Sequence, residues 1–319
     1  MTHSTTVAGI DTGKLKLDFA VTGSDQTWQV DNDKNGWKAL AERLKALGAK
    51  RVGIEASGGY EKGVVAYLRR HDFEVVVMQP LQVKAFARLN LRRAKNDKLD
   101  AKLIAACAAV IDDAAGKPDE RLDRLAPHLT FVEQCEEDIV RLKTRLEHTH
   151  DPRLRRMVLA EIARFEKRRK NELARIEAAL RLHDDLGRRL DLVFSIDGIG
   201  MRTAITLIVR MPELGGITRE QAASLAGLAP FDDDSGKHKG ARKIAGGRAR
   251  VRRSLYAAAF PAATQWNPAL IALYNRLMVK GKEHTAALVA CARKLVVYAN
   301  TVLARGTPWD SKRLALPAA

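Results

Sequence analysis

The chain contains little cysteine and has no apolar run long enough to cross a bilayer. Its 319 residues include three cysteines, Cys107, Cys135 and Cys291, which lie far apart. This scatter excludes a disulfide framework and a metal knuckle, and it fits a reduced cytoplasm in which the thiols act as small apolar side chains. No apolar run approaches the roughly 20 residues of a membrane span, and the first residues lack the charged-then-apolar pattern of a signal peptide. We therefore expect a cytoplasmic protein without a membrane partner.

Positive charge, in contrast, is abundant. Lysine and arginine number 55 against 38 aspartates and glutamates, which gives a net charge of +17 at pH 7. A field of this sign attracts polyanions, most often nucleic acid and less often anionic membrane. Hydrophobic residues make up 46% of the chain, enough to fill the cores of one large domain or of two to three ordinary ones.

The first segment, up to about residue 112, has the pattern of an α/β domain. Apolar and alternating stretches predict strands within 5–13, 14–23, 26–32, 50–59 and 73–80. Helical spacing predicts helices within 35–48, 60–72 and 92–106. Three early strands followed by alternation of helix and strand are typical of a ribonuclease-H-like fold, more than of a plain doubly wound sheet. We assign residues 1–115 to this domain.

The rest of the chain is helical. Within 116–192, leucine, valine and isoleucine recur every three or four residues, and Pro152 interrupts the pattern. Two long amphipathic helices joined by a turn explain this spacing, either as a coiled coil that associates with a second copy or as a spacer packed on its own chain. Residues 193–319 are predicted to form a mainly α C-terminal domain.

Four carboxylates of the first segment are candidate ligands of a metal ion. Asp11 and Glu55 each end a predicted strand, and Asp97 and Asp100 lie three residues apart, on one face at the start of a predicted helix. In a ribonuclease-H-like sheet the first and fourth strands are neighbours and the last helix crosses them, so all four acids can converge. Hard oxygen ligands suit Mg²⁺, which positions a scissile phosphate. Three of the acids also have structural alternatives: a turn for Asp11 and a helix N-terminus for the aspartate pair.

Arginine and lysine residues around these acids and in the C-terminal segment are candidate phosphate contacts. Beside the acids they are Arg92, Arg93 and Lys95. A second set follows Ser235 in the stretch "DDDSGKHKGARKIAGGRARVRR": Lys237, Lys239, Arg242, Lys243, Arg248, Arg252 and Arg253. Arg and Lys clamp phosphate oxygens and stabilise charge that develops during phosphoryl transfer.

Ser235 is a candidate nucleophile, although the sequence alone favours a basic nucleic-acid-binding loop. A serine needs a partner for its proton or a strongly polarised target, and no histidine is placed in an obvious triad; His238 is near in sequence only.

The segment Gly198-Ile199-Gly200 separates two helical stretches. It predicts a helix-hairpin-helix in which Gly198 and Gly200 let backbone amides approach a phosphate. A tight turn that needs glycine only for its dihedral angles is the alternative.

Five blocks in this order resemble one known family. They are "GIDTGKLKLDFAV", "GIEASGGYE", "KNDKLDAKLIA", "SIDGIGMRTA" and "GLAPFDDDSGKHKGARKIAGGRARVRRSLYAAA". Together they are similar to the DEDD transposases of the insertion-sequence family numbered one hundred and ten, which are bridge-RNA-guided serine recombinases related to the pilin-gene invertase. The resemblance covers nearly the whole chain. Thr12-Gly13 and Asn96 differ from the commoner family residues.

The resemblance implies a specific function. Asp11, Glu55, Asp97 and Asp100 would bind Mg²⁺, and Ser235 would attack DNA to form a covalent 5′-phosphoserine link. A bridge RNA would pair with target and donor DNA, so that base pairing reads sequence. It also implies a Holliday-junction-resolvase-like N-terminal domain, dimers that assemble into a tetramer with shared active sites, and a bacterial or archaeal protein near the nucleoid. A metal-dependent junction resolvase, a site-specific invertase and a non-catalytic nucleic-acid-binding protein with this fold are the alternatives.

Overall fold

The computed structural model describes residues 6–90, 97–111, 119–231, 234–235, 238–239 and 243–310. The chain divides into two compact units, Met1–Ala114 and Ala115–Ala319. The helical middle segment and the C-terminal segment fall in one unit, so their separation into two domains stays a prediction.

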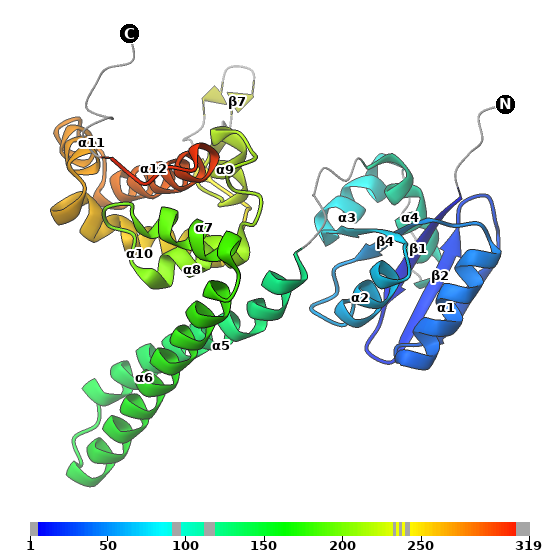
Figure 1. The fold of residues 1–319 in the computed structure, drawn as a ribbon, viewed down its shortest axis with the longest axis horizontal. Helices are drawn as coiled ribbons and strands as arrows, with labels where there is room; N and C mark the ends of the chain where they lie inside the picture. Colours follow the sequence, from blue (N-terminus) through cyan, green and yellow to red (C-terminus); the bar gives the residue numbers. More distant parts are fainter. Residues whose placement is uncertain are drawn as a thin grey trace. The chain divides into compact units, whose positions relative to one another are not determined.

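A five-stranded sheet forms the centre of the first unit (Figure 1). Its order is β3-β2-β1-β4-β5, in which β1 pairs antiparallel with β2 and parallel with β4. The predicted neighbourhood of the first and fourth strands is therefore confirmed. The strands are β1 (Val7–Thr12), β2 (Lys16–Val21), β3 (Thr27–Asp31), β4 (Arg51–Glu55) and β5 (Glu74–Met78).

Helices cover both faces of this sheet. On one face, Leu40 of α1 (Lys34–Ala46) and Val64 of α2 (Lys62–Arg70) share a buried cluster with Ile10 and Ile54. On the other, α3 (Pro80–Leu89) and α4 (Asp97–Val110) enclose a second cluster that contains Val7 and Met78. The pattern missed α3, whose start at Pro80 follows β5 directly. This mixed α/β architecture is consistent with the predicted ribonuclease-H-like fold.

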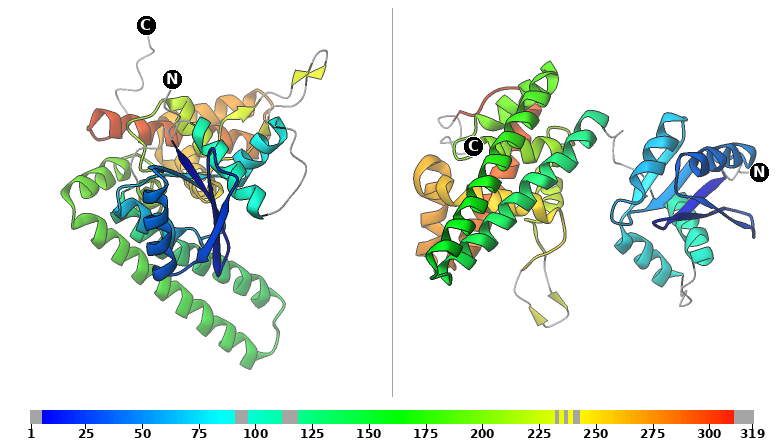
Figure 2. Two further views of the ribbon diagram at one scale, coloured as in Figure 1. Left: turned by 90° about the vertical axis from the view of Figure 1, so that its right-hand side faces the viewer. Right: turned by 90° about the horizontal axis from the view of Figure 1, so that it is seen from below.

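The second unit begins with two long helices that pack against each other, α5 (Glu120–Glu147) and α6 (Pro152–Arg181) (Figures 1 and 2). Pro152 occupies the first position of α6, where its missing N–H costs no hydrogen bond. Asp151 caps the helix by accepting hydrogen bonds from the amides of Arg153 and Leu154. The interruption seen in the sequence is thus the start of the second helix.

The remaining helices of this unit surround one core, to which Leu129 of α5 and Ile176 of α6 also belong. One of them, α12 (His284–Arg305), is long and apolar enough in composition to cross a membrane, but half of its apolar stretch is buried in the unit, as in a core helix. The helices are α7 (Asp184–Phe194), α8 (Met201–Arg210), α9 (Arg219–Leu225), α10 (Ala249–Pro261), a π-helical turn η1 (Ala262–Trp266), α11 (Pro268–Val279) and α12 (His284–Arg305).

Candidate active site

Asp11 and Glu55 lie at the same end of the sheet on neighbouring strands. The parallel register pairs Ile10 with Ile54, so the next residue on each strand is one of the two acids. Side chains alternate between the faces of a strand. Ile10 and Ile54 point into the cluster under α1 and α2, so both acids lie on the opposite face. Each is half-buried.

Two glycines bring α4 close to that face. A Cβ on Gly9 would lie 2.2 Å from the carbonyl oxygen of Ala101, and a Cβ on Gly53 would lie 2.4 Å from the Cβ of Ala108. Only glycine permits an approach this close. The sequence reading did not single out these glycines, although each stands two residues before a candidate acid.

The direction of α4 places its first residues at the acidic end of the sheet. Gly9 faces Ala101, whereas Arg51, the register partner of Val7 at the start of the strands, donates a hydrogen bond to the carbonyl oxygen of Ile111, just past the end of the helix. The helix therefore runs opposite to β1 and begins where Asp11 lies. Asp100 is half-buried, one residue before Ala101, and Asp97 is the first residue of the helix. The backbone thus brings all four predicted acids to one end of the first unit.

The described side chains do not complete a metal site by themselves. Among the described residues, no group of three histidine, cysteine, aspartate or glutamate side chains is placed to hold an ion. The side chain of Asp97 lies outside the described residues. Carboxylate oxygens are nevertheless the donor set that Mg²⁺ prefers, so the chemistry of these residues fits a divalent cation.

A fifth acid, Asp18, was missed by the sequence reading. It stands directly opposite Asp11 in the antiparallel register of β1 and β2, and therefore on the same face. Its carboxylate accepts hydrogen bonds from Nε2 of Gln29 at 2.9 and 3.2 Å. Alternation within "KLKLDFAV" puts Asp18 on the polar face of β2, but only the register of the hairpin brings it beside Asp11.

Glu61 organises the turn that follows Glu55. Its carboxylate, in a residue that is 8% exposed, accepts hydrogen bonds from the amides of Ser57 and Gly59 at 3.1 and 2.8 Å. Burial raises the pKa of this carboxyl, but the hydrogen bonds from the turn outweigh burial and leave its pKa below the ordinary value. The local sequence pattern did not predict this role for Glu61.

Ser235 lies in a narrow antiparallel ribbon of the second unit. β7 (Asp234–Ser235) pairs with β8 (His238–Lys239), and Ser235 is opposite His238. Nearer the body of the unit, β6 (Pro230–Phe231) pairs with β9 (Lys243–Ile244). The sequence predicted a loop here, and the juxtaposition with His238 follows only from the register.

The described arginines among the predicted nucleic-acid contacts are engaged with protein groups. Arg248 forms an ion pair with Glu213, and Arg253 forms one with Glu137 at 2.6 Å, with both partners largely exposed. Arg252 donates to backbone carbonyls. Their role toward nucleic acid stays a prediction. Arg92, Arg93, Lys95, Lys237 and Arg242 lie outside the described residues, as do the side chains of Lys239, Lys243 and Ser235.

The two glycines of the predicted helix-hairpin-helix have different surroundings. Gly198 has a φ of +93°, and a Cβ there would lie 2.3 Å from the Cβ of Ala262. Gly200 is the N-cap of α8, and a Cβ there would meet no atom within 4 Å. Gly198 is therefore required for packing, and only Gly200 is open to a ligand.

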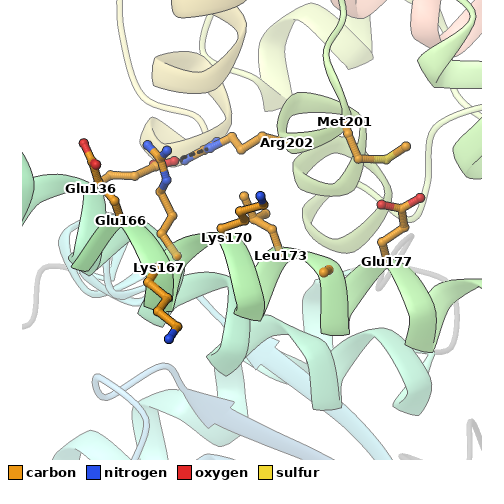
Figure 3. Close-up of a pocket in the computed structure, with 10 residues that line it drawn as sticks. Glu136, Glu166, Lys167, Lys170, Leu173, Glu177, Met201 and Arg202 are labelled. Carbon is orange, nitrogen blue, oxygen red and sulfur yellow. Dashed lines mark hydrogen bonds and ion pairs between the residues drawn. The ribbon is translucent and has the colours of Figure 1, made fainter. Parts of the chain in front are cut away.

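A cavity of about 780 Å³ opens beside the start of α8, between it and α6 (Figure 3). Its lining combines apolar Leu173 and Met201 with charged residues, and Arg202 is held by Glu136 through bonds of 2.6 and 3.1 Å. None of the predicted acids lines it.

Two family models match the chain. One, a DEDD transposase model of the IS110 type described as "Transposase", matches residues 8–155. The other, "Transposase IS116/IS110/IS902 family", matches residues 190–275. The first match contains all four predicted acids, and the second contains Ser235.

Curated relatives agree with these models. The pilin gene-inverting proteins of Moraxella bovis and Moraxella lacunata are each 26% identical, over 97% of this chain and 99% of their own length. The insertion element IS110 uncharacterized 43.6 kDa protein of Streptomyces coelicolor is 34% identical over 46% of this chain and 35% of its own length. Two transposase models over most of the chain, with relatives of this kind, show that the chain belongs to the IS110 family of transposases and is a DNA transposase/recombinase.

Proposed function

We propose that this transposase cuts and rejoins DNA through a covalent serine intermediate, at a divalent metal site formed by Asp11, Glu55, Asp97 and Asp100. The observation that supports the proposal most is the start of α4 at the carboxyl ends of β1 and β4. The DEDD family generally uses a divalent metal, and Mg²⁺ suits an all-carboxylate donor set. A bound cation would neutralise charge on the scissile phosphate.

In the proposed cleavage, the Oγ atom of Ser235 attacks phosphorus. One bond forms between Oγ and phosphorus, and the bond from phosphorus to the 3′ oxygen breaks. The serine proton passes to a base and a proton is delivered to the leaving 3′ oxygen, so the products are a 5′-phosphoserine link and a free 3′-hydroxyl. Attack by the 3′-hydroxyl of another strand reverses these steps and rejoins the DNA, with no net hydrolysis.

The proposal includes a guide RNA and an oligomer. A structured RNA that pairs with donor and target DNA would supply sequence specificity, as the family resemblance implies. Exposed apolar residues on α5 and α6 support self-association through a coiled coil, as dimers that assemble into a tetramer: Phe131, Val140, Leu154, Met157 and Leu159. The open N-terminus of α8 at Gly200 supports a phosphate contact by the helix-hairpin-helix. We place the protein in the cytoplasm, at the nucleoid.

The serine is tested by trapping the protein–DNA adduct. Ser235→Ala should abolish the adduct while RNA binding survives, because the nucleophilic oxygen is lost and the basic side chains remain. Ser224→Ala, an exposed serine on α9, is the matched control and should leave the adduct at the wild-type level. An undiminished adduct in the Ser235 variant would overturn the serine mechanism and favour a resolvase that activates water and leaves free ends.

The metal site is tested by strand cleavage in Mg²⁺. Asp11→Asn and Asp97→Asn should each lose cleavage, because a carboxamide is a neutral and weaker ligand. Asp25→Asn, at an exposed aspartate of the same unit, should retain it. Full cleavage in either of the first two variants would remove that acid from the site.

A site-specific DNA invertase is the second candidate function. The pilin gene-inverting relatives, which match 97% of this chain, favour it. Sequencing of the rejoined products decides between inversion and transposition. Inversion reverses the segment between two sites of one DNA molecule, whereas transposition inserts the element at a new site.

A further inference from the structure

The two ends of the segment that carries Ser235 meet in direct backbone contact. A Cβ on Gly247 would lie 2.3 Å from the amide nitrogen of Gly227, and a Cβ on Gly227 would lie 2.4 Å from the carbonyl oxygen of Gly246. Both Gly227 and Gly247 have positive φ, +69° and +64°. The amide of Arg248 adds a hydrogen bond of 2.8 Å to the carbonyl of Leu225. This glycine junction closes the base of the ribbon.

The guanidinium group of Arg252 lies in this junction. Its Nη1 donates to the carbonyl oxygen of Gly246 at 2.6 Å and approaches that of Gly227 at 3.5 Å. A Cβ on Gly227 would lie 2.2 Å from the same nitrogen. The arginine therefore occupies the space that the missing side chain of Gly227 leaves, and it contacts the chain on both sides of the loop.

The helix that carries Arg252 is firmly anchored. Val251 and Leu255, on either side of Arg252 along α10, are fully buried in the core of the second unit. A guanidinium group is planar, with its donors in a fixed fork. Because α10 is packed in the core, the guanidinium group of Arg252 fixes both ends of the loop relative to this helix.

We propose that Arg252 is a positioning residue, which sets the direction in which the ribbon presents Ser235 to DNA. This inference rests on the proposed serine mechanism. It differs from the expectation that Arg252 binds phosphate, because Nη1 of its guanidinium group is directed at main-chain oxygens at both ends of the loop.

Two variants of Arg252 separate the positioning role from a phosphate contact, according to which variant retains more adduct formation. Arg252→Lys keeps the positive charge but has no planar fork, whereas Arg252→Gln keeps N–H donors and loses the charge. A positioning role predicts that adduct formation at saturating DNA falls in both variants, by up to about 10²-fold. The glutamine variant should then form adduct at least as fast as the lysine variant. A positioning role also predicts unchanged DNA affinity. A phosphate contact predicts that lysine retains more than glutamine, and that glutamine weakens binding and reduces the salt slope by about one; that order would overturn the proposal.

Hydrogen exchange at the amide of Arg248 supplies a readout that is independent of chemistry. This amide bonds across the junction, so Arg252→Lys should accelerate its exchange relative to wild type, whereas Arg276→Lys, at an exposed residue of α11, should leave exchange, affinity and adduct rate unchanged. Unchanged exchange in the Arg252 variant would overturn the proposal. If the wild-type protein itself formed no adduct, the serine mechanism would be refuted, whereas the exchange result would still report on the junction.

Discussion

Glycine has two distinct uses in the turn between α7 and α8. At Gly198 the chain adopts a left-handed conformation against Ala262, whereas at Gly200 the space beyond Cα is open. Substitution by alanine therefore measures packing at one position and access at the other.

Gly198→Ala should lower the free energy of unfolding by about 2–5 kcal/mol, because a positive φ costs a side chain about 1–2 kcal/mol and overpacking adds about 1–3 kcal/mol. Gly200→Ala should change stability by less than about 1 kcal/mol and act, if at all, on nucleic-acid affinity. Urea unfolding and filter binding measure the two quantities. Equal losses of stability in the two variants would contradict this assignment.

Glu61 predicts a pH dependence in the first unit. The folded-state pKa of this carboxyl is lowered, so its contribution to stability is complete above the unfolded pKa of about 4.3 and is lost as the pH falls through the folded value. Glu61→Gln should therefore be less stable than wild type at about pH 6, and the difference should narrow toward about pH 3. Unfolding curves across that range test the prediction, and a gap that widened on acidification would refute it.

At the scale of elements, a buried carboxylate joins α5 to the C-terminal helices. The Glu133 side chain is 5% exposed and accepts hydrogen bonds from Nε and Nη2 of Arg210 at 3.1 and 2.8 Å. Arg250 of α10 pairs with the same carboxylate. Three helices thus meet at one side chain.

Glu133→Ala should destabilise the protein by about 3–5 kcal/mol, since it leaves the guanidinium of Arg210, which is 17% exposed, without its carboxylate partner. Glu137→Ala provides the matched control. Its pair with Arg253 is largely exposed, and its loss should cost far less, because solvent screens the two charges. Thermal or urea unfolding of the two variants measures both losses of stability. Similar losses would show that burial does not determine how much these ion pairs contribute to stability.

For the whole molecule, net charge governs binding to nucleic acid. The charge of +17 predicts an affinity that falls steeply with salt through release of counterions. With six to ten phosphate contacts, DNA affinity should weaken by about 10³–10⁵ between about 50 and 200 mM salt. A titration at several salt concentrations measures the slope, and a flat response would mean that basic side chains contribute little to binding.

The strands and most helices of the first unit could be predicted from the local sequence pattern. A strand or an amphipathic helix is encoded by the spacing of apolar residues that lie close together in the chain. The sequence reading missed α3, which follows β5 without a separate turn signal. It also missed Asp18, whose proximity to Asp11 depends on a hairpin register. Both failures involve the placement of segments rather than their composition.

The sequence by itself determined the charge, the alternation of strand and helix, and the family, because these reside in residue types and their spacing. Only the tertiary structure decided that α4 runs antiparallel to β1 over Gly9 and Gly53, that Gly198 serves packing, and that the guanidinium of Arg252 lies in a glycine junction. These features depend on contacts between residues distant in the chain, which local propensity does not encode.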